Sequence, residues 1–186
     1  MLNFTRKLSG DILELGVAGG ESLIRIKKWQ LKHRCNRNLY GFDSYEGYPA
    51  ANIEDGENWI KDGKPDYQKY TLGYVRQKMV DNGLTADQIA EIKLIKGWIP
   101  KSFEIYAGDK ISLINLDLNL YQPIIDSLNY FWDKMEIGGV ILLDEYDFGQ
   151  DESKHPGAKK AIDKFARSNA EEIHKNRYGK SFFVKV

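Results

Sequence analysis

The stretch DILELGVAGGESLIRI, residues 11–26, decides how the chain folds. Its first part, DILELGV, has the apolar content of a buried strand, and its last part has apolar residues at helical spacing. A turn with glycines at 16, 19 and 20 joins the two parts. A strand, a glycine turn and a helix in this order predict the first unit of an α/β sheet.

The rest of the chain repeats this alternation. Strand-length apolar runs lie at 38–43, 91–97, 111–118, 138–146 and 180–186, and helical patterns lie at 22–33, 66–83, 124–135 and 157–168. Strands separated by helices predict a mostly parallel sheet with helices on both faces. The length of 186 residues fits one domain, so we expect residues 1–186 to form a single unit.

The charge and composition of the chain argue against several classes of binding partner and location. The 27 basic and 27 acidic residues give a net charge of zero, which predicts no attraction to nucleic acid or to an anionic membrane. No apolar run reaches the roughly 18–20 residues of a membrane helix, and the first residues do not resemble a signal peptide. The single cysteine, Cys35, cannot form an internal disulfide and fits a cytoplasmic location.

The glycine turn predicts a ligand site, because ligands of such sheets bind beyond the carboxyl ends of the strands. The patterns G-x-G-x-x-G and G-K-[ST] are both absent here, which argues against dinucleotides and nucleoside triphosphates. Glu14 precedes the turn and would repel a phosphate. S-adenosylmethionine has a sulfonium and an ammonium group and no phosphate, so it fits better. The alternative is that Glu14 is a buried carboxylate tied into backbone hydrogen bonds.

Two further positions fit an adenosyl ligand. Asp43 ends the second strand, where an acid accepts hydrogen bonds from ribose hydroxyls. Gly97 and Trp98 follow the third strand, from which the adenine ring could be covered. Trp98 could equally serve ordinary packing.

Three acids follow two strands that should be neighbours. Asp117 ends the run at 111–118, and Asp144 and Glu145 end the next strand. Like charges at one place repel unless a cation lies among them, and oxygen ligands without Cys or His favour a hard ion such as Mg²⁺. The alternative is a set of solvated acids on loops.

The segment 46–68 is too long for an ordinary strand-to-helix connection. It is rich in Gly, Pro, Asn and Asp but also contains Tyr48, Trp59 and Tyr67. We expect it to form a lid over the substrate, the alternative being a plain surface loop.

The stretches ELGVAGGES, YGFDSYEGYP, KGWIPKSF, INLDLNLYQP, GGVILLDEY and GAKKAIDKF resemble, in order, those of the macrocin O-methyltransferase family. The resemblance implies a class I methyltransferase fold, with a seven-stranded, mostly parallel sheet and an antiparallel C-terminal strand. It implies S-adenosylmethionine and Mg²⁺ as cofactors and a sugar or similar vicinal diol as acceptor. The predicted metal ligands are Asp117, Asp144 and Glu145. The predicted cofactor contacts are Glu14, Gly16, Val17, Gly19, Ser22, Asp43, Ser44, Gly97, Trp98 and Asp117.

The chain departs from the family pattern at several places. Asn119 stands where the family usually has the second acid of D-x-D, and Glu145 stands where it usually has Asp. The chain also begins almost at the first strand, which leaves open an exposed site, a fragment, or a partner that supplies the cover. Candidates for the general base are Asp144 and His155.

The leading prediction is therefore a metal-dependent O-methyltransferase acting on a small-molecule hydroxyl. A catalytically degenerate adenosyl-binding module that regulates a partner is the first alternative. A nucleotide-sugar oxidoreductase is a second, which the missing G-x-G-x-x-G disfavours. A homodimer is possible, and Phe131 and Trp132 could serve either a dimer face or the core.

Overall fold

The computed structural model describes residues 1–57, 67–147 and 154–186. Its centre is a seven-stranded sheet of order β3-β2-β1-β4-β5-β7-β6, in which β7 runs antiparallel to both its neighbours. The strands are β1 (Asp11–Leu15), β2 (Leu39–Asp43), β3 (Ile92–Lys96), β4 (Ile111–Leu116), β5 (Met135–Leu143), β6 (His174–Lys175) and β7 (Ser181–Val184). The predicted mostly parallel sheet with an antiparallel C-terminal strand is confirmed.

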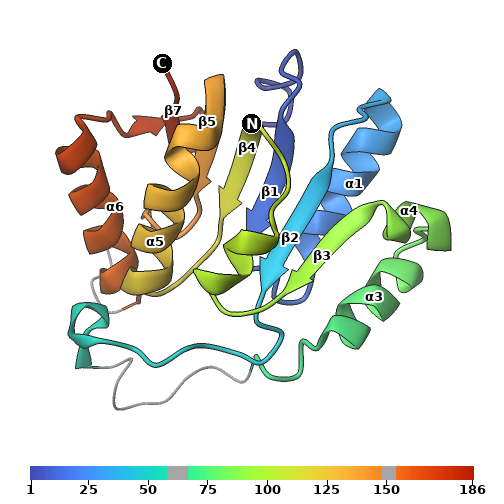
Figure 1. The fold of residues 1–186 in the computed structure, drawn as a ribbon, viewed down its shortest axis with the longest axis horizontal. Coiled ribbons are helices and arrows are strands. Elements are labelled where there is room, and N and C mark those ends of the chain that lie inside the picture. The colour runs from blue at the N-terminus through green and yellow to red at the C-terminus, as the bar shows by residue number, and fades with distance from the viewer. Residues whose placement is uncertain (58–66, 148–153) are drawn as a thin grey trace.

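Helices cover both faces of the sheet (Figure 1). They are α1 (Glu21–His33), α3 (Leu72–Asp81), α4 (Ala86–Ala90), α5 (Tyr121–Phe131) and α6 (Pro156–Asn169), with short 3₁₀ turns η1 (Ile53–Asp55), η2 (Lys101–Ile105) and η3 (Trp132–Lys134). Alternation along β1 explains the two layers, because successive strand residues point to opposite faces. Leu13 and Leu15 pack in the core cluster that contains α5 and α6, whereas Ile12 packs in the cluster that contains α1 and α3.

The structure differs from the sequence prediction at the late elements. Helix α5 begins at Tyr121 and ends at Phe131, and Met135 already belongs to β5. Phe131 and Trp132 are buried in the core, so neither offers a dimer face. Strand β6 was not predicted because two residues, one a charged lysine, carry no readable alternation.

The segment after β2 determines what lies over the carboxyl ends of the strands. In Figure 1 it runs below the sheet from the end of β2 to η1, which lies beside the starts of α5 and α6. Part of the predicted lid, residues 58–66 with Trp59, lies outside the described residues. Among the described helices, none combines the length and the apolar character that crossing a membrane requires.

Candidate active site

The sheet register brings the predicted site residues to one edge. Leu15 pairs with Phe42 of β2 and with Leu116 of β4, and Leu116 pairs with Leu143 of β5. The residues that follow these four in sequence are Gly16, Asp43, Asp117 and Asp144. They therefore leave the sheet at the same level, which is the carboxyl edge where ligands of such folds bind.

The glycine turn depends on Gly16. Its φ is +92°, and an ideal Cβ at this position would lie 2.0 Å from the backbone oxygen of Asp117. Only glycine fits so close to a second strand end at that φ. Gly19 is different, because the nearest atoms to an added Cβ belong to the flexible side chain of Glu21. Within the protein, the steric need for glycine thus lies at position 16 and not at position 19.

Asp43 holds the turn in place. Its Oδ2 accepts hydrogen bonds from the backbone N–H groups of Val17 (2.8 Å) and Ala18 (2.9 Å), and its Oδ1 accepts one from Tyr45 N (2.7 Å). A carboxylate has about four lone-pair positions. Three are occupied within the protein, so Asp43 has room for one further donor and not for a pair.

Glu14 lies beneath the turn and is 1% exposed. Asn115 Nδ2 donates to its Oε1 at 3.0 Å, while Oε2 is buried and has no hydrogen-bond partner in the described part of the chain. Burial raises the pKa of Glu14 to about 8, although the hydrogen bond from Asn115 acts in the opposite direction. The alternative of a carboxylate tied to the backbone does not hold, because the one bonded oxygen is held by a side chain.

This raised pKa predicts a pH effect on stability. Because Glu14 binds its proton more tightly in the folded chain, stability falls as pH rises from the unfolded value of 4.5 through about 8. Glu14→Gln removes the titration, and each pKa unit corresponds to about 1.4 kcal/mol. We expect urea denaturation to show that the wild type loses on the order of a few kcal/mol more than the variant between pH 5 and pH 8. Equal losses in the two proteins would contradict the assignment.

A pocket opens beside the turn, between the strand ends and the segment after β2. Trp98, which is 39% exposed, lies on its wall together with the backbone of Gly97. Aromatic residues of the segment after β2 and of the residues just before α3 complete the wall. The ring of Tyr67 contacts the rings of both Tyr48 and Tyr70. The lining residues are Gly16, Ala18, Phe42, Asp43, Ser44, Gly47, Tyr48, Pro49, Tyr67, Tyr70, Gly97, Trp98, Ile99, Asp117, Leu118, Asn119, Leu120, Pro123 and Glu145.

Two of the three predicted metal ligands, Asp117 and Glu145, line this pocket, and Asp144 lies next to them. One carboxylate oxygen from each of Asp117, Asp144 and Glu145 lies within 4.8 Å of the others. Burial and then the charge of Asp144 raise the pKa of Asp117 to about 6. Burial, Asp117 and Asp144 raise the pKa of Glu145 to about 7. Without a cation, the cluster therefore retains proton occupancy near neutral pH.

Lys180 is the residue at this cluster that the sequence analysis missed. It lies between β6 and β7, and its Nζ contacts Asp144 Oδ1 at 2.9 Å. The hairpin is held there by Asp147, which accepts hydrogen bonds from Ser181 N at 2.7 Å and Ser181 Oγ at 2.8 Å. Lys180 and Asp144 are 36 residues apart in sequence, and they meet because β7 pairs with β5, so no local sequence pattern predicts this contact.

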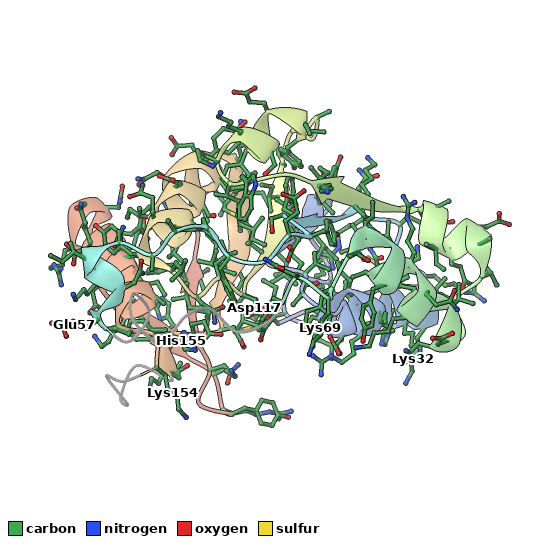
Figure 2. All side chains as sticks on the ribbon, turned by 90° about the horizontal axis from the view of Figure 1, so that it is seen from below. Lys32, Glu57, Lys69, Asp117, Lys154 and His155 are labelled. Carbon is green, nitrogen blue, oxygen red and sulfur yellow. The ribbon has the colours of Figure 1, made fainter. Side chains whose placement is uncertain are left out.

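His155 joins the cluster from the start of α6. Its Nε2 lies 3.2 Å from Glu145 Oε2, and burial lowers its pKa, so the imidazole is neutral at pH 7. Figure 2, which views the molecule from below, shows His155 and Asp117 under the carboxyl edge of the sheet. The structure thus brings both candidate bases, Asp144 and His155, to the acidic cluster.

Two predicted cofactor contacts have local roles. The Ser44 hydroxyl donates to Gly47 O at 2.7 Å and accepts from Glu46 N at 3.1 Å, which shapes the start of the segment after β2. Ser22 lies in the first turn of α1, where its hydroxyl accepts from Arg25 Nη2 at 3.0 Å. Ser44 lines the pocket, and Ser22 does not.

The profile of the macrocin-O-methyltransferase (TylF) family matches residues 4–176. The chain belongs to this family. The resemblance inferred from the sequence motifs is therefore confirmed.

Named relatives of the family are similar over most of the chain. Demethyldecarbamoylnovobiocin O-methyltransferase of Streptomyces niveus is 23% identical over 158 residues, 84% of this chain and 58% of the relative. The 8-demethyl-8-(2,3-dimethoxy-alpha-L-rhamnosyl)-tetracenomycin-C 4'-O-methyltransferase of Streptomyces olivaceus is 25% identical over 142 residues, 74% of this chain and 53% of the relative. The chain thus spans little more than half the length of these relatives.

A solved structure shows the same fold. The calicheamicin methyltransferase CalS11 superposes with a TM-score of 0.74 at 21% identity, and the match covers 98% of this chain and 74% of that one. The predicted class I methyltransferase fold is confirmed by this likeness.

Proposed function

We propose that the protein is an S-adenosylmethionine-dependent O-methyltransferase that uses Mg²⁺ and acts on a hydroxyl of a sugar or another small-molecule diol. The observation that carries the proposal is the acidic cluster, whose three carboxylate oxygens lie within 4.8 Å of one another and of which Asp117 and Glu145 line the pocket beside the glycine turn. A cofactor site and a metal site share one pocket, which is what a metal-assisted transfer to a hydroxyl requires.

The residues present fit the cofactor. Gly16 lets the backbone come close to the neighbouring strand end, and Asp43 retains room for one ribose hydroxyl. The unpartnered Oε2 of the buried Glu14 suits a cationic group, bound directly or through water. Trp98, Ile99 and Leu118 give an apolar surface for the adenine ring.

The same pocket fits the metal and the chemistry. Asp117, Asp144 and Glu145 would hold Mg²⁺ through carboxylate oxygens, as a hard cation prefers. When bound, the cofactor supplies the methyl group and the ion lowers the pKa of the acceptor hydroxyl. Glu145 Oε2 accepts from Nε2 of His155 and so orients the ring, and the other nitrogen of the neutral imidazole, Nδ1, would accept the hydroxyl proton.

The acceptor would lie under the segment after β2. Gly47, Tyr48 and Pro49 of that segment line the pocket, which supports its role as part of a substrate cover. The polar Asn119 and the tyrosine hydroxyls offer hydrogen-bonding groups to a polyhydroxylated acceptor. The acceptor class comes from the named relatives, of which the Streptomyces olivaceus enzyme is named for a rhamnosyl-bearing tetracenomycin.

The experiment that tests the function combines binding and turnover. Calorimetry with S-adenosylhomocysteine measures cofactor binding, and release of S-adenosylhomocysteine from S-adenosylmethionine is followed with a panel of nucleotide-linked and natural-product sugars in Mg²⁺. Binding with transfer to a sugar hydroxyl supports the proposal. Binding without transfer to any hydroxyl acceptor would favour the regulatory module, and no binding would remove the cofactor assignment.

Asp43→Ala tests the ribose contact. Because only one lone-pair position is available, we expect a loss of roughly 1.5 kcal/mol in cofactor binding, about tenfold in Kd. The variant also releases Val17 N and Ala18 N, so the measurement is a double-mutant cycle with a deoxyribose analogue of S-adenosylhomocysteine. We expect the combined loss in binding free energy to be smaller than the sum of the losses from the variant and from the analogue. A combined loss equal to that sum would mean that Asp43 holds the turn and does not contact the ribose.

A further inference from the structure

Asp55 is a buried carboxylate outside the acidic cluster. It is 2% exposed, and no Lys or Arg in the described ranges pairs with it. Its Oδ1 accepts a hydrogen bond from Tyr121 N at 2.7 Å, and its Oδ2 accepts one from Asn52 N at 2.8 Å. A buried carboxylate is stable only when its oxygens are satisfied, so these backbone groups determine where Asp55 lies.

The bond to Tyr121 makes Asp55 the cap of α5. The residue before this helix is Leu120, whose side chain cannot accept a hydrogen bond, and α5 has no side-chain cap of its own. Its first N–H groups need an acceptor. Asp55, 66 residues away in sequence, supplies that acceptor, and its charge is favourable at the positive end of the helix.

The same carboxylate packs against the start of α6. An ideal Cβ at Gly157 would lie 2.0 Å from Asp55 Oδ1, so only glycine fits there. Helix α6 also lacks a side-chain cap, and its N-cap residue is His155. Next to these contacts, Glu54 pairs with Lys160 of α6 at 3.3 Å.

The position of η1 beside the two helix starts does not depend on buried apolar side chains. Ile53 is 84% exposed, and Asp55 alone of the three η1 residues is buried. The position of η1 relative to the helices therefore depends on the polar contacts of Asp55. Those contacts join the segment after β2, which lines the pocket, to the starts of two helices.

We propose that Asp55 is a positioning residue, which caps α5 and abuts α6 and so holds the Asp117–Leu120 turn and His155 in their places around the pocket. The inference rests on the proposed function for its kinetic consequence, but the structural consequence is independent of it. A small shift of a reacting group is enough to slow an enzyme strongly, on the order of 10²-fold for about 1 Å.

The test uses Asp55→Ala and a matched control, Asn52→Ala. Asp55→Ala removes both carboxylate oxygens, so the backbone N–H groups of Tyr121 and of Asn52 both lose their acceptor. Asn52→Ala removes the side-chain cap of η1 at Glu54 N, 2.8 Å away, and leaves the bond between Asp55 and Tyr121 in place. The control thus loosens η1 without releasing α5.

Hydrogen exchange, cofactor affinity and turnover are measured on the full chain. For Asp55→Ala we expect faster exchange at residues 118–125 and 155–161, and at Asn52, whose N–H also loses its acceptor, with cofactor Kd within about twofold and kcat lower by roughly 10²-fold. Asn52→Ala should show none of these changes at the two helix starts.

The hydrogen-exchange and turnover measurements distinguish failure of the positioning role from failure of the proposed function. Unchanged exchange at both helix starts, or a kcat loss equal to that of Asn52→Ala, would overturn the positioning role. If the wild type transfers no methyl group, the proposed function fails, and the exchange arm still decides whether Asp55 holds α5 and α6.

Discussion

Asp144→Ala should abolish methyl transfer and leave cofactor affinity nearly unchanged. Asp144 lies in the carboxylate cluster and not at the glycine turn, so on the proposed assignment its loss removes a metal ligand and not a cofactor contact. Metal assistance is worth several kcal/mol, which at about 1.4 kcal/mol per tenfold corresponds to on the order of a thousandfold in rate. Excess chelator should have the same effect on the wild type, with recovery on addition of Mg²⁺.

The contact with Lys180 requires a second variant. Asp144→Ala leaves the Lys180 ammonium, formerly 2.9 Å from Asp144 Oδ1, next to the two remaining acids, where it could take the place of a cation. Asp144→Ala combined with Lys180→Met removes that charge and should remain inactive. Asp126→Ala, on the exposed face of α5, is the control that should retain full activity. Undiminished transfer by the wild type in excess chelator would refute the metal assignment and leave the fold untouched.

His155→Gln should lower kcat by about 10²–10⁴-fold, the usual contribution of a general base. The imidazole is next to Glu145, and its lowered pKa keeps it neutral at pH 7. In the wild type, activity should fall as pH decreases below 6.5 and the ring takes up a proton, and the residual activity of the variant should not show that loss.

A matched control is available for this prediction. His174→Gln changes a histidine of β6, on a strand at the far side of β7 from β5, and should leave both the rate and its pH profile unchanged. An unaltered kcat in His155→Gln, measured with saturating cofactor and Mg²⁺, would shift the role of base to Asp144.

Much of the fold and of the site was predictable from local sequence. The apolar strands, glycine at 16 and acids at the end of β2 and directly after β4 and β5 are all visible in the sequence, and the parallel register places those acids at one edge. The prediction that Asp117, Asp144 and Glu145 converge followed from this regularity alone, and the structure brings their oxygens together.

The residues that were missed depend on contacts between distant segments. Lys180 reaches Asp144 only because β7 pairs with β5, and Asp55 reaches Tyr121 only because the segment after β2 crosses below the sheet. The one local signal for Asp55 is the capping box it forms with Asn52, which predicts a turn but not a cap on another helix.

The strand order has a consequence for synthesis on the ribosome. Residues 181–184 pair along the apolar run from Val140 to Leu143, on the side of β5 that faces away from β4. Until those residues have been translated and have emerged, that side of β5 is an open apolar edge able to pair with another nascent chain. Lys180 emerges equally late, so the carboxylates at the carboxyl end of β5 are synthesised well before their lysine partner. The vulnerable period in the biosynthesis of this protein is therefore the interval between translation of β5 and translation of β7.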